Sequence, residues 1–188
     1  MRSLPRLSSA SPGALSPREG EPEALWKSPG LLRRRAPRPL FWGLFLALLL
    51  FDQGSKGWIL EHGMDLPLSL VPGLLNVVSV RNTGIVFGLF AGHNWLWIGV
   101  GASFLLAGFL VGKSLDWSRR ETNVIAALLA AGATGNIIDR VVHGFVVDFI
   151  DAYVGSWHWP SFNVADSCLC VASLWIIFRW VIVPKSRP

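Results

Sequence analysis

Four long apolar segments constrain the fold of this chain more than any other feature. They cover residues 39–60, 94–112, 122–142 and 162–183. About 20 helical residues, rising ~1.5 Å each, cross the ~30 Å hydrocarbon layer of a bilayer. Apolar residues make up 52% of the chain and charged residues only 15%, a composition that is too apolar for an ordinary soluble domain of this length. The sequence therefore predicts an all-α integral membrane protein with four transmembrane helices.

Basic residues predict the orientation of these helices, because Lys and Arg stay on the cytoplasmic side of a membrane. Eight Lys or Arg precede the first segment, and further basic residues are Lys113, Arg119, Arg120, Lys185 and Arg187. Residues 61–93 contain only Arg81, and residues 143–161 contain no Lys or Arg. We therefore expect both termini in the cytoplasm and these two connecting segments outside. The basic residues lie beside apolar runs and form no single stripe, so nucleic acid is not an expected partner.

The remaining segments predict a tail and a small sheet. Residues 1–38 are rich in Pro, Ser, Gly and Arg and read as a disordered basic cytoplasmic tail. They precede the membrane domain of residues 39–183, and residues 184–188 form a second cytoplasmic tail. The β-prone run at 75–80 lies between the first two helices, where it predicts a small extracytoplasmic β-containing segment. A near-strand run follows at 145–150.

Polar residues of three predicted helices lie at one membrane level. Asp52 lies about 18 Å from Leu40 by helical rise, in the outer half of the bilayer, and the run GNIIDR ends the third helix at the same level. The run FNVADS, which contains Asp166, begins the fourth helix at that level too. An ionisable residue at a helix centre costs ~2.5–3.5 kcal/mol, so several at one depth indicate a shared interior site. Ion pairs that lock the helices together, Asp52 with Lys56 or Asp139 with Arg140, are an alternative.

Two further carboxylates, Asp148 and Asp166, have no basic neighbour in sequence and predict a catalytic pair. Two close carboxylates cannot both ionise cheaply, so one keeps a proton while the other acts as a base. Such a pair can activate water and protonate an amide leaving group without a metal or a cofactor. The sequence has no HExxH pair, GxSxG elbow or Gly-rich phosphate loop, which the competing chemistries require. The pattern favours an aspartyl endopeptidase.

Five motifs in this order resemble the lipoprotein signal peptidase family, also called signal peptidase II. They are DQGSK at 52–56, RNTGIVFG at 81–88, GNIIDR at 135–140, VVDF at 146–149 and FNVADS at 162–167. The resemblance implies a catalytic dyad of Asp148 and Asp166. It also implies that supporting or substrate-binding roles fall on Asp52, Lys56, Asn82, Asn136, Arg140 and Asn163.

The same resemblance implies the substrate and the location. The substrate would be a prolipoprotein whose cysteine already carries diacylglycerol, cut just before that cysteine to release the signal peptide. The enzyme would act as a monomer among the lipids of the bacterial inner membrane, with its active site near the outer face. Ile85, Val86 and Thr134 depart from the residues common in the family, and bulkier residues there would alter how the substrate fits.

Two other functions and one question remain open at this point. Intramembrane acids also serve small transporters or channels, and buried ion pairs also serve a non-enzymatic scaffold. A transporter would show broken helices or internal repeats, which this sequence lacks, and a scaffold leaves Asp148 and Asp166 without a role. Residues 1–38 lie outside the resemblance and are either a lineage-specific extension or an artefact of the chosen start site.

Overall fold

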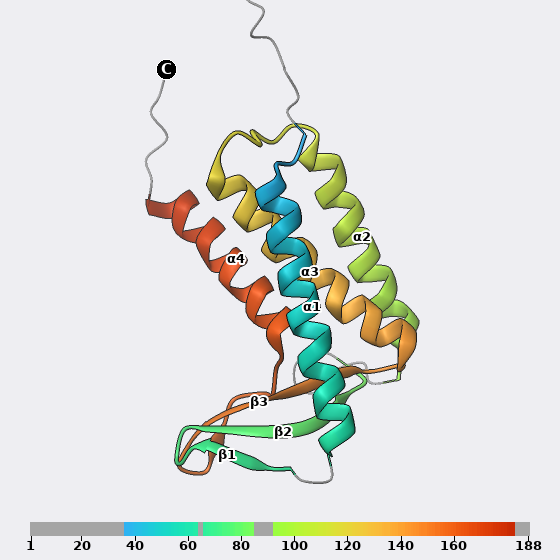
Figure 1. The fold of residues 1–188 in the computed structure, drawn as a ribbon, viewed down its shortest axis with the longest axis vertical. Coiled ribbons are helices and arrows are strands. Elements are labelled where there is room, and N and C mark those ends of the chain that lie inside the picture. The colour runs from blue at the N-terminus through green and yellow to red at the C-terminus, as the bar shows by residue number, and fades with distance from the viewer. Residues whose placement is uncertain (1–35, 64–65, 85–91, 183–188) are drawn as a thin grey trace, which may run out of the picture. The chain divides into compact units, whose positions relative to one another are not determined.

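Four long helices dominate the computed structural model, which describes residues 36–63, 66–84 and 92–182 (Figure 1). They are α1 (Pro39–His62), α2 (Asn94–Gly112), α3 (Arg120–Val142) and α4 (Val164–Ile182). The predicted helices are confirmed, with ends shifted by less than one turn. The tails at 1–38 and 184–188 were predicted on residues that lie outside the described ranges, apart from 36–38.

Helix α3 lies at the centre and packs against each of the other three helices. Small residues make this possible: Ala127, Ala131 and Gly132 are all buried on α3. A side chain on Gly132 would collide with the backbone oxygen of Ala165 on α4. Small residues at a helix interface let backbones approach closely, which is how membrane helices gain packing contacts.

A four-stranded antiparallel sheet lies beyond one end of the helices, below α1 in Figure 1. Its strands, in sheet order, are β1 (Leu68–Val71), β2 (Leu75–Asn82), β3 (Val146–Val154) and β4 (Trp157–His158). The β-prone runs predicted at 75–80 and 145–150 both lie in strands, β2 and β3. The prediction did not include their pairing, in which Leu75 lies opposite Ala152 and Asn82 lies opposite Val146, or the strands β1 and β4.

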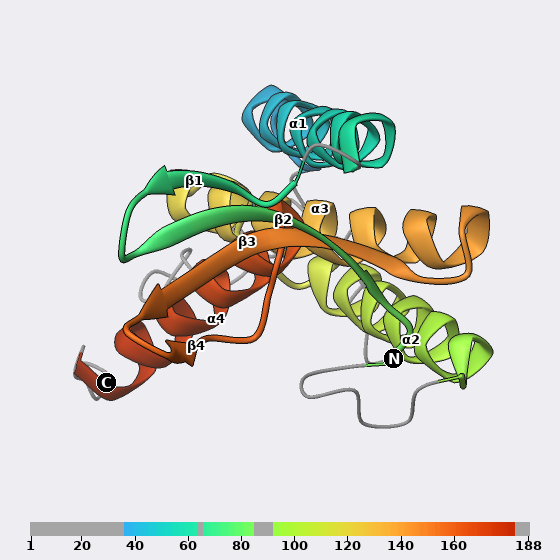
Figure 2. The ribbon, with the colours of Figure 1, turned by 90° about the horizontal axis from the view of Figure 1, so that it is seen from below.

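Buried side chains on β3 hold the paired strands β2 and β3 against the helices. Val147 and Phe149 on β3 pack with Ile59 of α1 in a core cluster at this end. The view from the sheet side shows β2 and β3 crossing beneath the helix ends (Figure 2). The sheet therefore fixes β3, the strand of Asp148, against α1.

Apolar side chains cover much of the outer surface of the helices. Helices α2 and α3 are long and apolar enough to cross a membrane, and α2 has no buried residue. Exposed apolar side chains continue on the other two helices, for example Leu50 of α1, which is 71% exposed, and Ile177 of α4. Such a surface suits lipid rather than water.

Candidate active site

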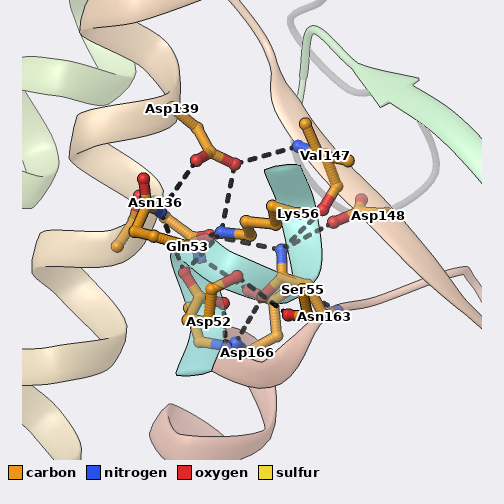
Figure 3. A network of polar contacts seen from close by, with 12 residues as sticks. Asp52, Gln53, Ser55, Lys56, Asn136, Asp139, Val147, Asp148, Asn163 and Asp166 are labelled. Carbon is orange, nitrogen blue, oxygen red and sulfur yellow. Dashed lines mark hydrogen bonds and ion pairs between the residues drawn. The ribbon is translucent and has the colours of Figure 1, made fainter. Parts of the chain in front are cut away.

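Lys56 on α1 is the buried cation at the centre of the polar network (Figure 3). Its Nζ atom lies 2.9 Å from Asp52 Oδ2 and 3.0 Å from Asp139 Oδ2. It also donates a hydrogen bond of 3.1 Å to Asn136 Oδ1. A buried charge is tolerated only when it is paired and hydrogen-bonded, and Lys56 meets both conditions. Of the two ion pairs considered from sequence, Asp52 with Lys56 is present, whereas Asp139 pairs with Lys56 instead of with Arg140.

Asp139 connects this cation to the strand that carries Asp148. Its Oδ2 atom accepts a hydrogen bond of 3.0 Å from the backbone N–H of Val147, the residue before Asp148. Its Oδ1 atom accepts a hydrogen bond of 3.0 Å from Gln53 Nε2. Gln53 also donates to the backbone oxygen of Gly135, at 3.2 Å. The start of β3 is thereby fixed to both α1 and α3.

Asp148 is 2% exposed and is held by two side-chain amides. Asn82 Nδ2 donates to Oδ2 at 2.8 Å, and Asn163 Nδ2 donates to Oδ1 at 2.8 Å. Burial, followed by repulsion from the Asp166 carboxylate, raises the pKa of Asp148 from 3.8 to about 7, although the two amide hydrogen bonds oppose the shift. Asp148 therefore keeps its proton up to nearly neutral pH, as one member of a carboxylate pair must.

Asp166 occupies the third position of α4, where Asn163 precedes the helix. Asn163 Oδ1 accepts a hydrogen bond of 2.9 Å from the Asp166 N–H, and Asp166 Oδ2 accepts one of 3.3 Å from the Asn163 N–H. This reciprocal arrangement is a capping box. The other oxygen of Asp166, Oδ1, accepts a hydrogen bond of 2.8 Å from Asn136 Nδ2. The helix start thus fixes the direction of the carboxylate.

Asn163 joins the two carboxylates, since it donates to Asp148 through its side chain and to Asp166 through its backbone. The residues brought together around them include seven of the eight site residues predicted from sequence: Asp52, Lys56, Asn82, Asn136, Asp148, Asn163 and Asp166. Figure 3 shows this network where α1, α3, α4 and β3 meet.

Arg140 lies at the same level but has a different partner. Its guanidinium donates a hydrogen bond of 2.6 Å to the backbone oxygen of Gly84, and its backbone oxygen accepts one of 2.8 Å from Asn94. It therefore holds the chain just after Asn82 rather than bonding either carboxylate directly. Residues 85 and 86, where the sequence departs from the family pattern, lie outside the described ranges.

A cavity of about 1240 Å³ opens beside the carboxylates. Its polar end includes Asp166, Asn136 and Arg140. Its wall along α2, α3 and α4 is mostly apolar, with Phe104, Leu129, Ile137, Leu169 and Ile176. This shape suits a ligand with one polar group and long apolar chains. Within residues 36–63, 66–84 and 92–182, no three His, Cys, Asp or Glu side chains gather as a metal site requires.

The sequence analysis missed the positions of Gln53 and Asp139 in this network. Asp139 was considered only as a partner of Arg140, and Gln53 was not considered at all. Their spacing from predicted site residues could have indicated them. Gln53 adjoins Asp52, and Asp139 follows Asn136 by three residues, so each lies within about one helical turn of a predicted site residue.

Comparisons with known proteins agree on one family. The sequence model of Signal peptidase (SPase) II matches residues 44–182. The lipoprotein signal peptidase of Serratia proteamaculans is 35% identical over 77% of this chain and 88% of its own length. The lipoprotein signal peptidase of Vibrio cholerae is 36% identical over 77% of this chain and 90% of its own. A solved bacterial membrane enzyme matches the fold with a TM-score of 0.71 and 30% identity, covering 79% of this chain and 93% of the other.

Proposed function

The chain belongs to the signal peptidase II family, and from this premise we propose that Asp148 and Asp166 are the catalytic dyad of an aspartyl endopeptidase. Family membership confirms the resemblance found in the sequence. It makes the protein a membrane-embedded protease that removes signal peptides from prolipoproteins.

The bridge through Asn163 is the observation that carries the dyad proposal. One residue hydrogen-bonds to both carboxylates, so their oxygens face the same small volume. With one proton between them, the ionised carboxylate accepts a proton from water, and the water oxygen attacks the scissile carbonyl carbon. The protonated carboxyl then donates its proton to the amide nitrogen as the C–N bond breaks. The amine of the new N-terminus leaves, and the dyad again holds one proton.

The cavity beside Asp166 supports a lipid-modified substrate. Its polar end adjoins the dyad and its apolar wall runs along the helices. We therefore place the acyl chains of a diacylglyceryl cysteine along Phe104, Leu129 and Ile176, with the peptide bond before that cysteine at Asp166. The acyl chains move from lipid to an apolar wall, so their contacts position the substrate through packing rather than through hydrophobic transfer free energy.

The surface of the helices supports four membrane spans in the bacterial inner membrane. Exposed apolar side chains such as Leu50 of α1 and Ile177 of α4 would face lipid, and the Lys and Arg asymmetry would place both termini in the cytoplasm and the sheet outside. As the family resemblance implies, we propose a monomer, and the acid–base chemistry of two carboxylates requires no cofactor.

The test of this function is cleavage of a lipid-modified precursor by the purified protein. We expect a diacylglyceryl-modified prolipoprotein to be cut before the modified cysteine, with product masses read by mass spectrometry, and an unmodified precursor to be cut far more slowly. Equal cleavage of both precursors would remove the role proposed for the cavity. Absence of cleavage of either would contradict the function itself.

A further inference from the structure

A second cavity, of about 440 Å³, lies at the end of the helices where α1 and α3 begin, away from the sheet (Figure 1). It is lined by Arg38, Pro39, Leu40 and Arg120. None of these residues belongs to the polar network around Asp148. Two arginines therefore line one hollow at the opposite end of the helices from the proposed dyad.

The acidic residues near this cavity are already paired with other cations. Asp116 lies 3.1 Å from Arg119 Nε, and Glu121 lies 2.8 Å from Arg179 Nε. Among residues 36–63, 66–84 and 92–182, no carboxylate lies within ion-pair distance of Arg38 or Arg120. Two like charges beside one hollow repel each other, and an anion between them would remove that repulsion.

The start of α1 adds to the positive potential of the cavity. Arg38 is the N-cap of α1 but makes no side-chain cap, and the first turn contains no acidic residue. The first turn of a helix carries partial positive charge from its aligned peptide dipoles, although in α1 Pro39 has no N–H and the Phe41 N–H donates a hydrogen bond of 2.9 Å to the Arg38 oxygen. The wall is also held in place, because the buried Asn123 accepts a hydrogen bond of 3.1 Å from the Arg38 N–H.

Apolar side chains beside the cavity favour a lipid as the source of the anion. Leu40 in the cavity wall is 38% exposed, and exposed apolar side chains such as Trp42 continue around and along α1. A guanidinium pair binds phosphate strongly, and basic pockets at the ends of membrane helices bind anionic headgroups. We propose that this cavity binds the phosphate of an anionic phospholipid headgroup, while the acyl chains lie along the exposed start of α1.

The experiment uses the full-length protein in detergent and measures bound lipid by native mass spectrometry. The wild type is titrated with phosphatidylglycerol or phosphatidylcholine, and inorganic phosphate is the competitor. The cavity variant is Arg38→Gln with Arg120→Gln, which keeps the backbone N–H that Asn123 accepts. Its matched control is Lys113→Gln with Arg119→Gln, which removes the same charge at the same end without changing the cavity lining. Peptidase activity of both variants in detergent checks that they are folded.

We expect the wild type to prefer phosphatidylglycerol, and the cavity variant to lose roughly 10- to 30-fold of that affinity, the loss typical of two basic residues near a membrane surface. The control should keep nearly the wild-type affinity, because neither Lys113 nor Arg119 lines the cavity. An equal loss in both variants would show diffuse charge attraction and overturn the proposal, as would no lipid preference in the wild type. Displacement of phosphatidylglycerol by an equal concentration of inorganic phosphate would overturn the proposal, because it would show that the cavity binds free phosphate rather than a lipid headgroup.

Discussion

At the scale of single residues, the site depends on side-chain amides whose orientation is fixed by their partners. Asn136 Oδ1 accepts hydrogen bonds from Lys56 and Asn163, which leaves its NH₂ group to donate to Asp166. An amide flipped by 180° would place its oxygen against the carboxylate. We therefore expect the buried Lys56 to act on the proposed dyad through Asn136, as a positioning residue rather than a catalytic one.

This role predicts the result of removing the Lys56 ion pairs. The triple variant Asp52→Asn, Lys56→Met and Asp139→Asn should fold, because Lys56 pairs with both carboxylates, and replacing all members of a buried ion pair is often tolerated. Its turnover should nevertheless fall by at least about 10-fold, equivalent to ~1.4 kcal/mol of transition-state stabilisation, because Asn136 loses the donor that orients it. A thermal melt and a cleavage assay on the same preparation separate the two effects. Turnover at the wild-type rate would show that these charges stabilise the fold and have no role in cleavage.

The raised pKa of Asp148 predicts how cleavage depends on pH. Its folded pKa of about 7 lies above the ordinary 3.8, so the proton is present below about pH 7 and is lost as the pH rises through that value. Cleavage, which needs one proton on the pair, should decline over the same range. The Asn82 hydrogen bond lowers this pKa, so Asn82→Ala should raise it and move the alkaline limb of the pH profile to higher pH.

Asn76→Ala is the matched control for this experiment. Asn76 lies on the same strand, β2, and donates a hydrogen bond of 3.1 Å to Asp151 rather than to Asp148. Its substitution should leave the alkaline limb where it is in the wild type. A limb that stays in place in Asn82→Ala, or moves to lower pH, would contradict the proposed link between Asn82 and the titrating carboxyl.

At the scale of helices and strands, close packing of α3 against α1 and α4 holds the network together. Gly135 on α3 leaves room for the Asp52 carboxylate, which a side chain at this position would meet. The same carboxylate accepts a hydrogen bond of 2.8 Å from the Ala165 N–H at the start of α4. Because Gly135 has no side chain, the Asp52 carboxylate of α1 can lie between α3 and the start of α4.

Gly135→Ala tests this packing. The added methyl group should displace Asp52 and destabilise the protein by ~1–3 kcal/mol, the usual cost of overpacking, and turnover should fall with the loss of the Ala165 hydrogen bond. The control is Gly57→Ala on α1, where an added methyl meets nothing within 4 Å. Thermal melts of the two variants give the comparison. A Gly135→Ala protein as stable and active as Gly57→Ala would show that the contact has no such role.

These elements also show what the sequence could predict. Segment length and hydropathy were enough for the four helices, and helical rise was enough to place Asp52 and Asp166 at one level. Which side chains at that level bond to one another was harder to predict. Adjacent helical residues point about 100° apart, and the rotation of each helix about its axis depends on packing. Asp139 therefore pairs with Lys56 and not with its neighbour Arg140. The β2–β3 pairing joins segments that are distant in sequence, which local patterns do not reveal.

At the scale of the whole molecule, the positions of charge and sheet predict the orientation in the membrane. The connection between α2 and α3 contains Ser114 beside Lys113, Arg119 and Arg120, whereas Gly155 lies in the turn between β3 and β4. Reporters inserted at Ser114 and Gly155 should lie on opposite sides of the membrane, with the one at Ser114 in the cytoplasm. A cytoplasmic signal from both positions would contradict the four-span arrangement.

The account as a whole requires both carboxylates of the dyad, and their separate removal tests it most directly. The measurement is turnover of a diacylglyceryl-modified prolipoprotein by purified Asp148→Asn and Asp166→Asn, with Asp116→Asn as a control for an exposed carboxylate at the other end of the helices. Amides keep the size of the side chains but cannot share a proton, so each dyad variant should lose at least about 10³-fold in turnover, while the control keeps wild-type turnover. Cleavage at a near wild-type rate by either dyad variant, correctly folded by thermal melt, would contradict the account.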